Sequence, residues 1–150
     1  MSQPLIVNNT ISIHAPAATV WDILTNPEQT KKYMFGCVPI SDWKPGSPLI
    51  WKGVFNDVEM VAVKGHILSI RPNSSLIYTV IDPNNPDIPD IPENYLTVTC
   101  QLDEEGDHTL LTVTQGDYNK VAAGAIRYED TVKGGGWDSI LVQIKALAES

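Results

Sequence analysis

The sequence predicts an α+β fold in which a curved antiparallel sheet wraps around one long C-terminal helix, with two short helices after the first strand. Three patterns support this prediction. Segments between residues 49 and 115 alternate apolar and polar side chains with the period of two that is typical of half-buried strands. Turn signals separate these segments, and strands joined by tight turns pair antiparallel. The last segment has the spacing of an amphipathic helix, and one helix covers a long sheet only where the sheet curls around it.

The N-terminal part predicts a strand followed by two helices. Residues 5–13 have the composition of an opening strand. Pro16 fits the first turn of a helix, where its missing N–H would be unpaired in any case. A second helix begins at Asn26, a good N-cap residue, with Pro27 at the first helical position. The chain therefore places two short helices in tandem.

Two central strands are joined by a turn at Asn56 and Asp57. With a period of two, one face of each strand is mainly apolar and the other carries the charged residues, so the apolar face should point inward. The inward residues would be Leu49, Trp51, Gly53 and Phe55 in the first strand, and Val61, Val63, Gly65 and Ile67 in the second.

Three further strands are expected at residues 76–81, 95–102 and 109–115. The segment 82–93 between the first two is rich in proline and aspartate, and proline removes the backbone donors that a strand needs. The sequence Glu-Glu-Gly-Asp at residues 104–107 predicts a hairpin turn. Whether loop 82–93 closes over the interior or passes beside it is left open by the sequence.

The C-terminal helix is indicated by one apolar stripe, formed by Trp137, Ile140, Leu141, Ile144 and Ala148. Three glycines at residues 134–136 precede it, and glycine is unfavourable inside a helix. Two interpretations are considered. The glycines mark the start of the helix or a bend that lets the chain approach the sheet, which we favour, or they form a hinge that lets residues 118–133 open.

Composition limits the function. The 150 residues fit one domain, residues 1–150, and carry a formal net charge of −8. The basic residues are few and scattered, which disfavours binding to nucleic acid or to an anionic membrane surface. No segment has the length and apolarity of a membrane span, and the first nine residues lack a secretory pattern. We therefore expect a cytoplasmic protein with no membrane and no nucleic-acid partner.

The sequence contains no motif for a cofactor or a metal. Cys37 and Cys100 form no C-x-x-C pair, and no histidine is placed to activate either thiol. His14, His66 and His108 show no metal-ligand spacing such as H-x-x-x-H. We expect no cofactor and no metal site, and no catalytic residue can be assigned.

Several segments together resemble a known family. They are Ala15-Pro16-Ala17 with Val20-Trp21 and residues 25–28, then residues 65–72 with 76–79, residues 109–115, and Gly136-Trp137 with Leu141. With the order of the elements, they resemble the SRPBCC superfamily (START-like, Bet v 1-like), and within it the domain related to the activator of Hsp90 ATPase. The resemblance implies a helix-grip fold. It leaves function open, because related scaffolds serve lipid and hormone carriage, polyketide cyclisation and co-chaperone action.

A cavity between sheet and helix is the expected binding site. A strongly curved sheet around a helix is hard to fill completely, although a fully packed core would give the same apolar pattern. Gln115 is the one polar group expected to orient a ligand. The candidate ligand-binding residues are Trp51, Phe55, Val61, Val63, Tyr78, Val98, Leu111, Val113, Gln115, Trp137 and Leu141.

The function expected from this site is binding of a small hydrophobic or amphipathic molecule. One alternative is a protein-interaction module that resembles the Hsp90 co-chaperone domain. Another is a cyclase- or hydrolase-type enzyme that uses pocket acids such as Glu129 or Asp130, with Glu59 a further candidate for a buried acid. The lack of recognisable catalytic motifs makes the enzyme the weaker of these interpretations.

Overall fold

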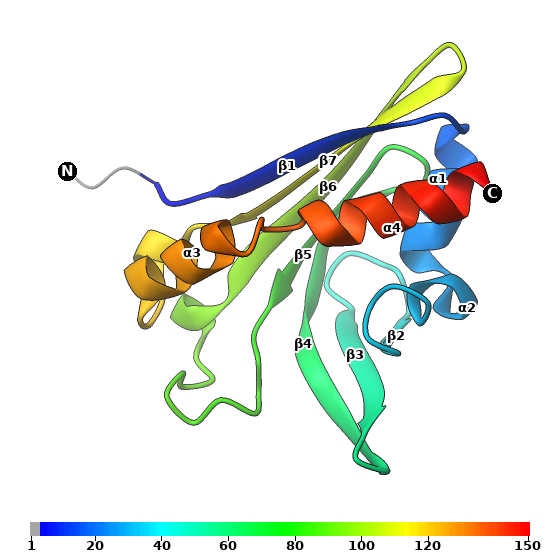
Figure 1. Cartoon of the computed structure of the whole chain (residues 1–150). Coiled ribbons are helices and arrows are strands. Elements are labelled where there is room, and N and C mark those ends of the chain that lie inside the picture. Colours follow the sequence, from blue (N-terminus) through cyan, green and yellow to red (C-terminus); the bar gives the residue numbers. More distant parts are fainter. Residues whose placement is uncertain (1–3) are drawn as a thin grey trace.

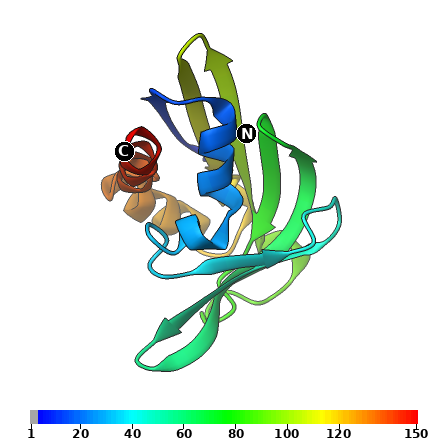
Figure 2. The ribbon, with the colours of Figure 1, turned by 90° about the vertical axis from the view of Figure 1, so that its right-hand side faces the viewer.

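A single seven-stranded antiparallel sheet forms the body of the chain in the computed structural model, which describes residues 4–150. The strand order is β1-β7-β6-β5-β4-β3-β2. Helix α4 lies across the concave face of this sheet (Figure 1). The view turned by 90° shows the sheet curling around the helices (Figure 2). The predicted fold class, a curved sheet that grips a C-terminal helix, is therefore confirmed.

The elements predicted from the sequence appear in the expected order, and strand β2 and helix α3 are additional elements that were not predicted. Two short 3-10 helices, η1 (Pro92–Asn94) and η2 (Tyr118–Lys120), lie in the connections. The strands are β1 (Val7–Ile13), β2 (Val38–Ser41), β3 (Pro48–Phe55), β4 (Val58–Arg71), β5 (Ser75–Val80), β6 (Leu96–Glu105) and β7 (His108–Gly116). The α-helices are α1 (Ala17–Thr25), α2 (Pro27–Thr30), α3 (Gly124–Lys133) and α4 (Asp138–Glu149). Among these described residues, no helix is long and apolar enough to cross a membrane.

Local signals explain several element boundaries. The Asn26 side chain accepts a hydrogen bond from the backbone N–H of Glu28 at 3.0 Å, so it caps α2 as predicted. Asn56 and Asp57 both have positive φ, 52° and 63°, and join β3 to β4. Two positive φ values in a two-residue hairpin turn match the right-handed twist of the strands, and Asn and Asp tolerate them.

A β-bulge in β4 changes which of its residues face inward. Trp51 pairs with Val63, but the next residue of β3, Lys52, pairs with Val61, so Ala62 is an extra residue in β4. A bulge bends its strand and moves the following side chains to the other face. The inward phase predicted for β4 holds from Val63 onward and is wrong at Val61.

The packed core lies between the sheet and helices α1 and α4. Leu111, Val113 and Leu141 are fully buried there, with no exposed surface on any of the three. The stripe on α4 thus buries Leu141 and Ile144 against the β1–β7 side of the sheet, as the helical spacing predicts. Large aliphatic side chains in this position each stabilise the fold by about 1.5–3 kcal/mol through burial.

The glycines at 134–136 separate α3 from α4, so the C-terminal helical segment is divided in two. Gly135 and Gly136 have φ of +89° and +62°, which favours glycine. A Cβ on Gly136 would lie 2.5 Å from Oδ1 of Asn9 in β1. The Asn9 side chain also donates to the Gly135 carbonyl at 3.2 Å and accepts from the Trp137 N–H at 3.0 Å. These contacts agree with a bend that brings the chain close to the sheet.

Loop 82–93 is held beside β4, where β4 extends beyond the end of β5 (Figure 1). The Asn84 amide donates to the Val61 carbonyl at 2.8 Å. Lys64 of β4 pairs with Asp90, whose carboxylate also accepts a 2.6 Å hydrogen bond from the Tyr95 hydroxyl. Ile88, within the loop, is buried. The loop is therefore anchored at the end of the β4–β5 ladder.

Candidate ligand cavity

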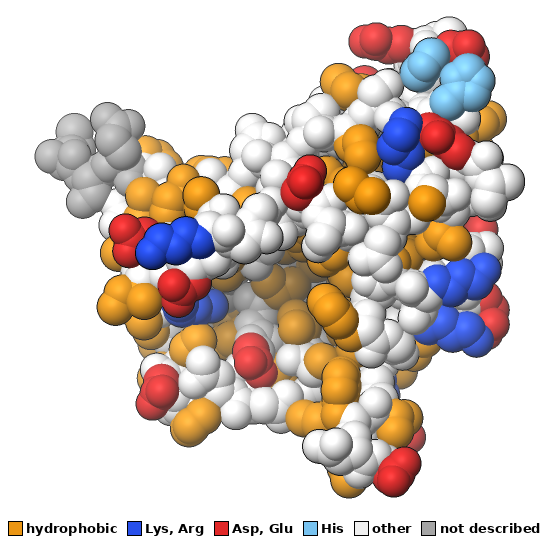
Figure 3. Space-filling view, in the orientation of Figure 1, with side chains coloured by type: hydrophobic (Ala, Val, Ile, Leu, Met, Phe, Trp, Pro, Cys, Tyr) orange, Lys and Arg blue, Asp and Glu red, His pale blue; other side chains and the backbone are white. Residues whose placement is uncertain are grey.

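An open cavity of about 440 Å³ lies between the sheet, the start of α4 and the segment that follows α2. The space-filling view shows a hollow bordered by apolar side chains, below the helices and above the β3–β4 hairpin (Figure 3). Its volume is in the range of small-molecule sites in proteins. The curved sheet is therefore not completely filled by its own side chains.

Seven of the residues predicted from the sequence line this cavity together. They come from strands β3 to β7 and from the start of α4, far apart in the sequence. The seven are Trp51, Phe55, Val63, Tyr78, Val98, Gln115 and Trp137. Their role in binding a ligand stays a prediction, because their position alone does not identify an occupant.

Four predicted residues do not line the cavity. Leu111, Val113 and Leu141 face inward, but they are packed in the core and do not border the cavity. Strand alternation predicts that a residue faces inward, and it does not distinguish packed positions from positions at a void. Val61 is excluded for a different reason, because the bulge at Ala62 reverses its direction.

Nine lining residues were not among those predicted. Ala62 and Val63 are consecutive residues of β4. Both line the cavity because the bulge at Ala62 interrupts the alternation of the strand. Phe35 is 80% exposed and has a φ of 55°, which no strand or helix pattern would reveal. Ile140 lies on the apolar stripe of α4, so helical spacing could have indicated it. The nine are Met34, Phe35, Cys37, Ala62, Val80, Tyr118, Thr131, Gly136 and Ile140.

Gln115 and Trp137 form the main polar contact in the cavity wall. The indole Nε1 of Trp137 donates to Oε1 of Gln115 at 2.8 Å. An indole N–H can only donate, so the partner must be the amide oxygen, and the amide NH₂ is the end that remains. This NH₂ makes no hydrogen bond to a described residue. Gln115 thus supports the segment before α4 through this bond, and its role in orienting a ligand stays a prediction.

The Tyr78 hydroxyl is a second polar group within reach of the cavity. The Tyr78 ring is buried and lines both the cavity and a satellite space of about 10 Å³, which is close to the size of one water molecule. The Tyr78 hydroxyl makes no hydrogen bond to a described residue. Every fully buried polar side-chain atom among the described residues has a hydrogen-bond partner, so this hydroxyl is not fully buried. The hydroxyl therefore keeps contact with open space.

Burial keeps the titratable groups around the cavity neutral. Desolvation raises the pKa of the Cys37 thiol, and it raises the pKa of Cys100, behind the wall, to about 12. Desolvation, with a smaller contribution from Cys100, also holds the Tyr78 pKa well above its ordinary value. At neutral pH these groups are thiols and a phenol. Neither cysteine is therefore an activated nucleophile.

The acids considered from the sequence lie elsewhere. Glu129 and Asp130 are exposed on α3, and neither lines the cavity, although Thr131 does. Glu59 is exposed on β4 and forms a 2.7 Å ion pair with Lys52. Among residues 4–150, no carboxylate and no imidazole lines the cavity. Its wall is uncharged.

Comparisons with known proteins agree with this fold. The sequence profile described as "Activator of Hsp90 ATPase homolog 1-like protein" matches residues 14–149. A protein of Cytophaga hutchinsonii, solved in solution, is 36% identical, with 99% of this chain and 97% of that chain covered and a TM-score of 0.75. No curated protein matches the chain.

Two more distant structures share the fold. A crystal structure of a protein from Chromobacterium violaceum is 19% identical, with 99% of each chain covered and a TM-score of 0.75. The Aha1 dimer from Colwellia psychrerythraea, solved in solution, is 18% identical, with 96% of each chain covered and a TM-score of 0.68. At these identities the likeness concerns the fold alone.

Proposed function

Because the chain belongs to the family of activator of Hsp90 ATPase homolog 1-like proteins, whose members are ligand-binding or co-chaperone-like modules in general terms, we propose that its cavity binds a small, uncharged, apolar or amphipathic molecule. The observation that carries the proposal is the open apolar cavity of about 440 Å³. Burial of apolar ligand surface there supplies about 25 cal/mol per Å² before the costs of association.

The cavity wall favours a ligand with aromatic or aliphatic bulk. Trp51, Phe55 and Trp137 offer large, flat side chains, and aromatic pairs gain about 0.5–1.5 kcal/mol beyond the buried area. A charged group would lose its hydration in this wall with no partner to compensate it, which costs several kcal/mol. A ligand with a charged end would therefore keep that end at the mouth, near Phe35.

The polar groups favour a ligand with a hydrogen-bond acceptor. The Gln115 NH₂ provides donors only, and the Tyr78 hydroxyl provides one more donor. A carbonyl, ether or hydroxyl oxygen in the ligand would satisfy them. An amphipathic molecule with one such oxygen and an aromatic or branched apolar body fits the cavity better than a plain hydrocarbon.

The two alternatives carry less support. An enzyme would need an acid or base in the wall, and the described lining residues supply only neutral thiol, phenol, hydroxyl, indole and amide groups. A protein-interaction module is favoured by Val54 and Val58, which are 66% and 59% exposed around the β3–β4 turn. This pair is small, and single exposed aliphatic residues are common on monomers. One domain over residues 1–150 and a cytoplasmic location also remain predictions.

The proposal is tested by native mass spectrometry of the purified protein, followed by a thermal-shift screen with sterols, fatty acids and neutral aromatic polyketides. We expect a co-purifying mass or a saturable rise in Tm with a neutral compound. Phe55→Ala should abolish the rise. Val54→Ala is the matched control, because Val54 is the preceding residue of β3 and is exposed. No bound mass and no shift across the panel would reject ligand binding and favour the interaction module.

A further inference from the structure

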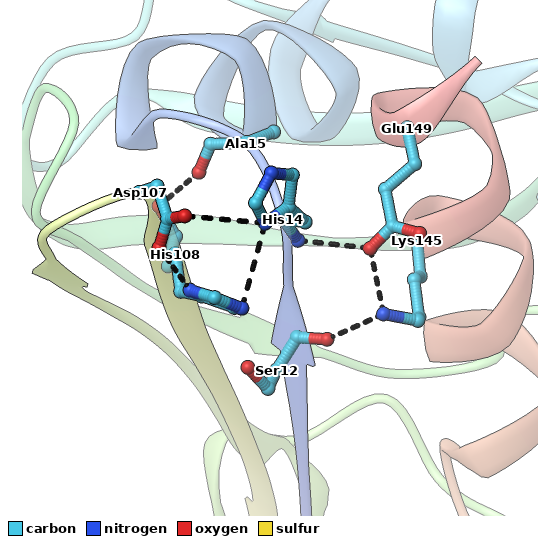
Figure 4. A network of polar contacts seen from close by, with 8 residues as sticks. Ser12, His14, Ala15, Asp107, His108, Lys145 and Glu149 are labelled. Atoms are coloured by element: carbon cyan, nitrogen blue, oxygen red, sulfur yellow. Dashed lines mark hydrogen bonds and ion pairs between the residues drawn. The ribbon is translucent and has the colours of Figure 1, made fainter.

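Two histidines that are 94 residues apart meet at the end of the sheet away from the cavity. His14 directly follows β1, and His108 is the first residue of β7. Because Ile13 pairs with Thr109, the antiparallel register places His14 opposite His108. Figure 4 shows the two rings next to each other, with Asp107 beside them.

The ring nitrogens have a spacing that suits a shared metal ion. His14 Nδ1 and His108 Nε2 are 3.5 Å apart. Two nitrogen ligands at about 2.05 Å from a tetrahedral ion are about 3.3 Å apart. As a direct hydrogen bond, 3.5 Å between the nitrogens is long. The two rings are nearly perpendicular, at 84°. The distance between the two nitrogens is therefore close to that of two ligands of one tetrahedral ion.

Asp107 supplies the supporting contact that metal-binding histidines need. Its Oδ1 is 2.5 Å from His108 Nδ1. When Nδ1 carries the proton of this hydrogen bond, Nε2 presents its lone pair toward His14. The second oxygen, Oδ2, is 3.7 Å from His14 Nδ1, within the span of two ligands on one ion.

The surroundings are negatively charged and already ordered. The backbone N–H of His14 donates to Glu149 at 2.8 Å, and Lys145 bonds both Glu149 and the Ser12 carbonyl (Figure 4). Glu104 accepts from the backbone N–H of Ala17 at 2.8 Å. These bonds fix the backbone that carries His14. The lysine is engaged with Glu149, so it does not compete for Asp107.

We propose that His14, His108 and Asp107 form a surface site for a divalent transition-metal ion of the Zn²⁺ type. His14 Nδ1 and His108 Nε2 bind the ion, Asp107 orients His108 or adds an oxygen ligand, and water completes the coordination of this exposed site. Imidazole nitrogen selects Zn²⁺, Ni²⁺ or Cu²⁺ over Mg²⁺ and Ca²⁺, which take oxygen ligands. The proposal departs from the expectation drawn from the sequence, where spacing alone gave no metal site.

Occupation of this site would join β1 to the β6–β7 hairpin. β1 is an edge strand that pairs only with β7, so an ion between His14 and His108 would hold its C-terminal end in place. The ion binds only the folded arrangement, because the two histidines are distant in the unfolded chain. Metal binding should therefore raise Tm as well as perturb the two rings.

The test is a titration of tag-free protein with ZnCl₂, followed by the histidine ring signals in NMR and by Tm. The chain has three histidines, so His66 serves as an internal control. We expect His14 and His108 to shift together and to saturate at one ion per chain, while His66 stays unchanged. MgCl₂ should shift none of them.

Variants separate the site from other Zn²⁺ binding. His14→Gln and His108→Gln should each abolish the saturable rise in Tm, and His66→Gln should leave it intact. Asp107→Asn should weaken binding about 10–100-fold, as the loss of a supporting carboxylate does. The absence of saturable binding, or a Tm rise that survives both His14→Gln and His108→Gln, would overturn the proposal.

Discussion

Trp137 and Gln115 are joined across the cavity wall by a 2.8 Å hydrogen bond from the indole Nε1 to the amide oxygen. The bond ties the residue before α4 to the C-terminal end of β7. It also fixes the orientation of the Gln115 amide, so that its NH₂ is the end without a partner among the described residues. One contact thus links the packing of α4 to the polarity of the cavity.

Trp137→Phe should lower the free energy of unfolding by about 1 kcal/mol more than the same change at Trp21, because both changes replace an indole by the smaller phenyl ring but only Trp137 loses a hydrogen bond. Urea unfolding followed by circular dichroism measures this difference. Trp21→Phe is the control, since the Trp21 indole makes no hydrogen bond to a described residue. An equal loss in both variants would show that the bond to Gln115 contributes nothing of its own.

Gly136→Ala should destabilise the protein by about 1–2 kcal/mol or more, because a residue with Cβ is unfavourable at φ +62°. The new Cβ would also displace Asn9 from its contacts with Gly135 and Trp137. Gly134→Ala is the matched control, because Gly134 has a negative φ and its Cβ would have room. If both variants keep wild-type stability in urea, the close approach to β1 is not what requires the glycine.

Stability should fall as the pH rises above about 9, and Cys100 should account for part of this fall. The thiol titrates near 9.0 when exposed and at about 12 in the folded protein. Between these values the unfolded chain loses the proton and the folded chain keeps it, which removes about 1.4 kcal/mol of stability per pH unit. Cys100→Ala should flatten the plot of unfolding free energy against pH in this window. Identical slopes for variant and wild type would contradict the assignment.

Asp90→Asn should loosen loop 82–93 without changing the affinity of the cavity. The carboxylate is the common partner of Lys64 and Tyr95, and the hydrogen bond from Lys64 lowers its pKa. No residue of this loop lines the cavity. We expect faster amide exchange in residues 82–93, measured by mass spectrometry, and an unchanged Kd for an apolar probe. A weaker Kd would show that the loop gates the cavity.

The sequence was sufficient for the order of six strands, the two helices after β1 and the last helix, because alternation, helical spacing and turn residues act locally, but it missed β2 and α3. It located seven lining residues for the same reason. It could not place Val61 and Ala62, because a bulge depends on pairing between strands. It did not separate Leu111 and Val113, which are packed in the core, from Val98, which borders the cavity. The pairing of His14 with His108 likewise depends on the register of β1 with β7.

The most direct test of the account is a titration with N-phenyl-1-naphthylamine, a neutral apolar probe whose emission rises when it leaves water. We expect saturable binding that quenches tryptophan emission, since Trp51 and Trp137 line the cavity. Val63→Trp should fill the cavity and abolish binding, while Leu68→Trp, on the exposed side of the same strand, should bind like wild type once unfolding curves show both variants to be folded. Equal binding by Val63→Trp and Leu68→Trp, or no saturable binding by the wild type, would contradict the cavity as a ligand site.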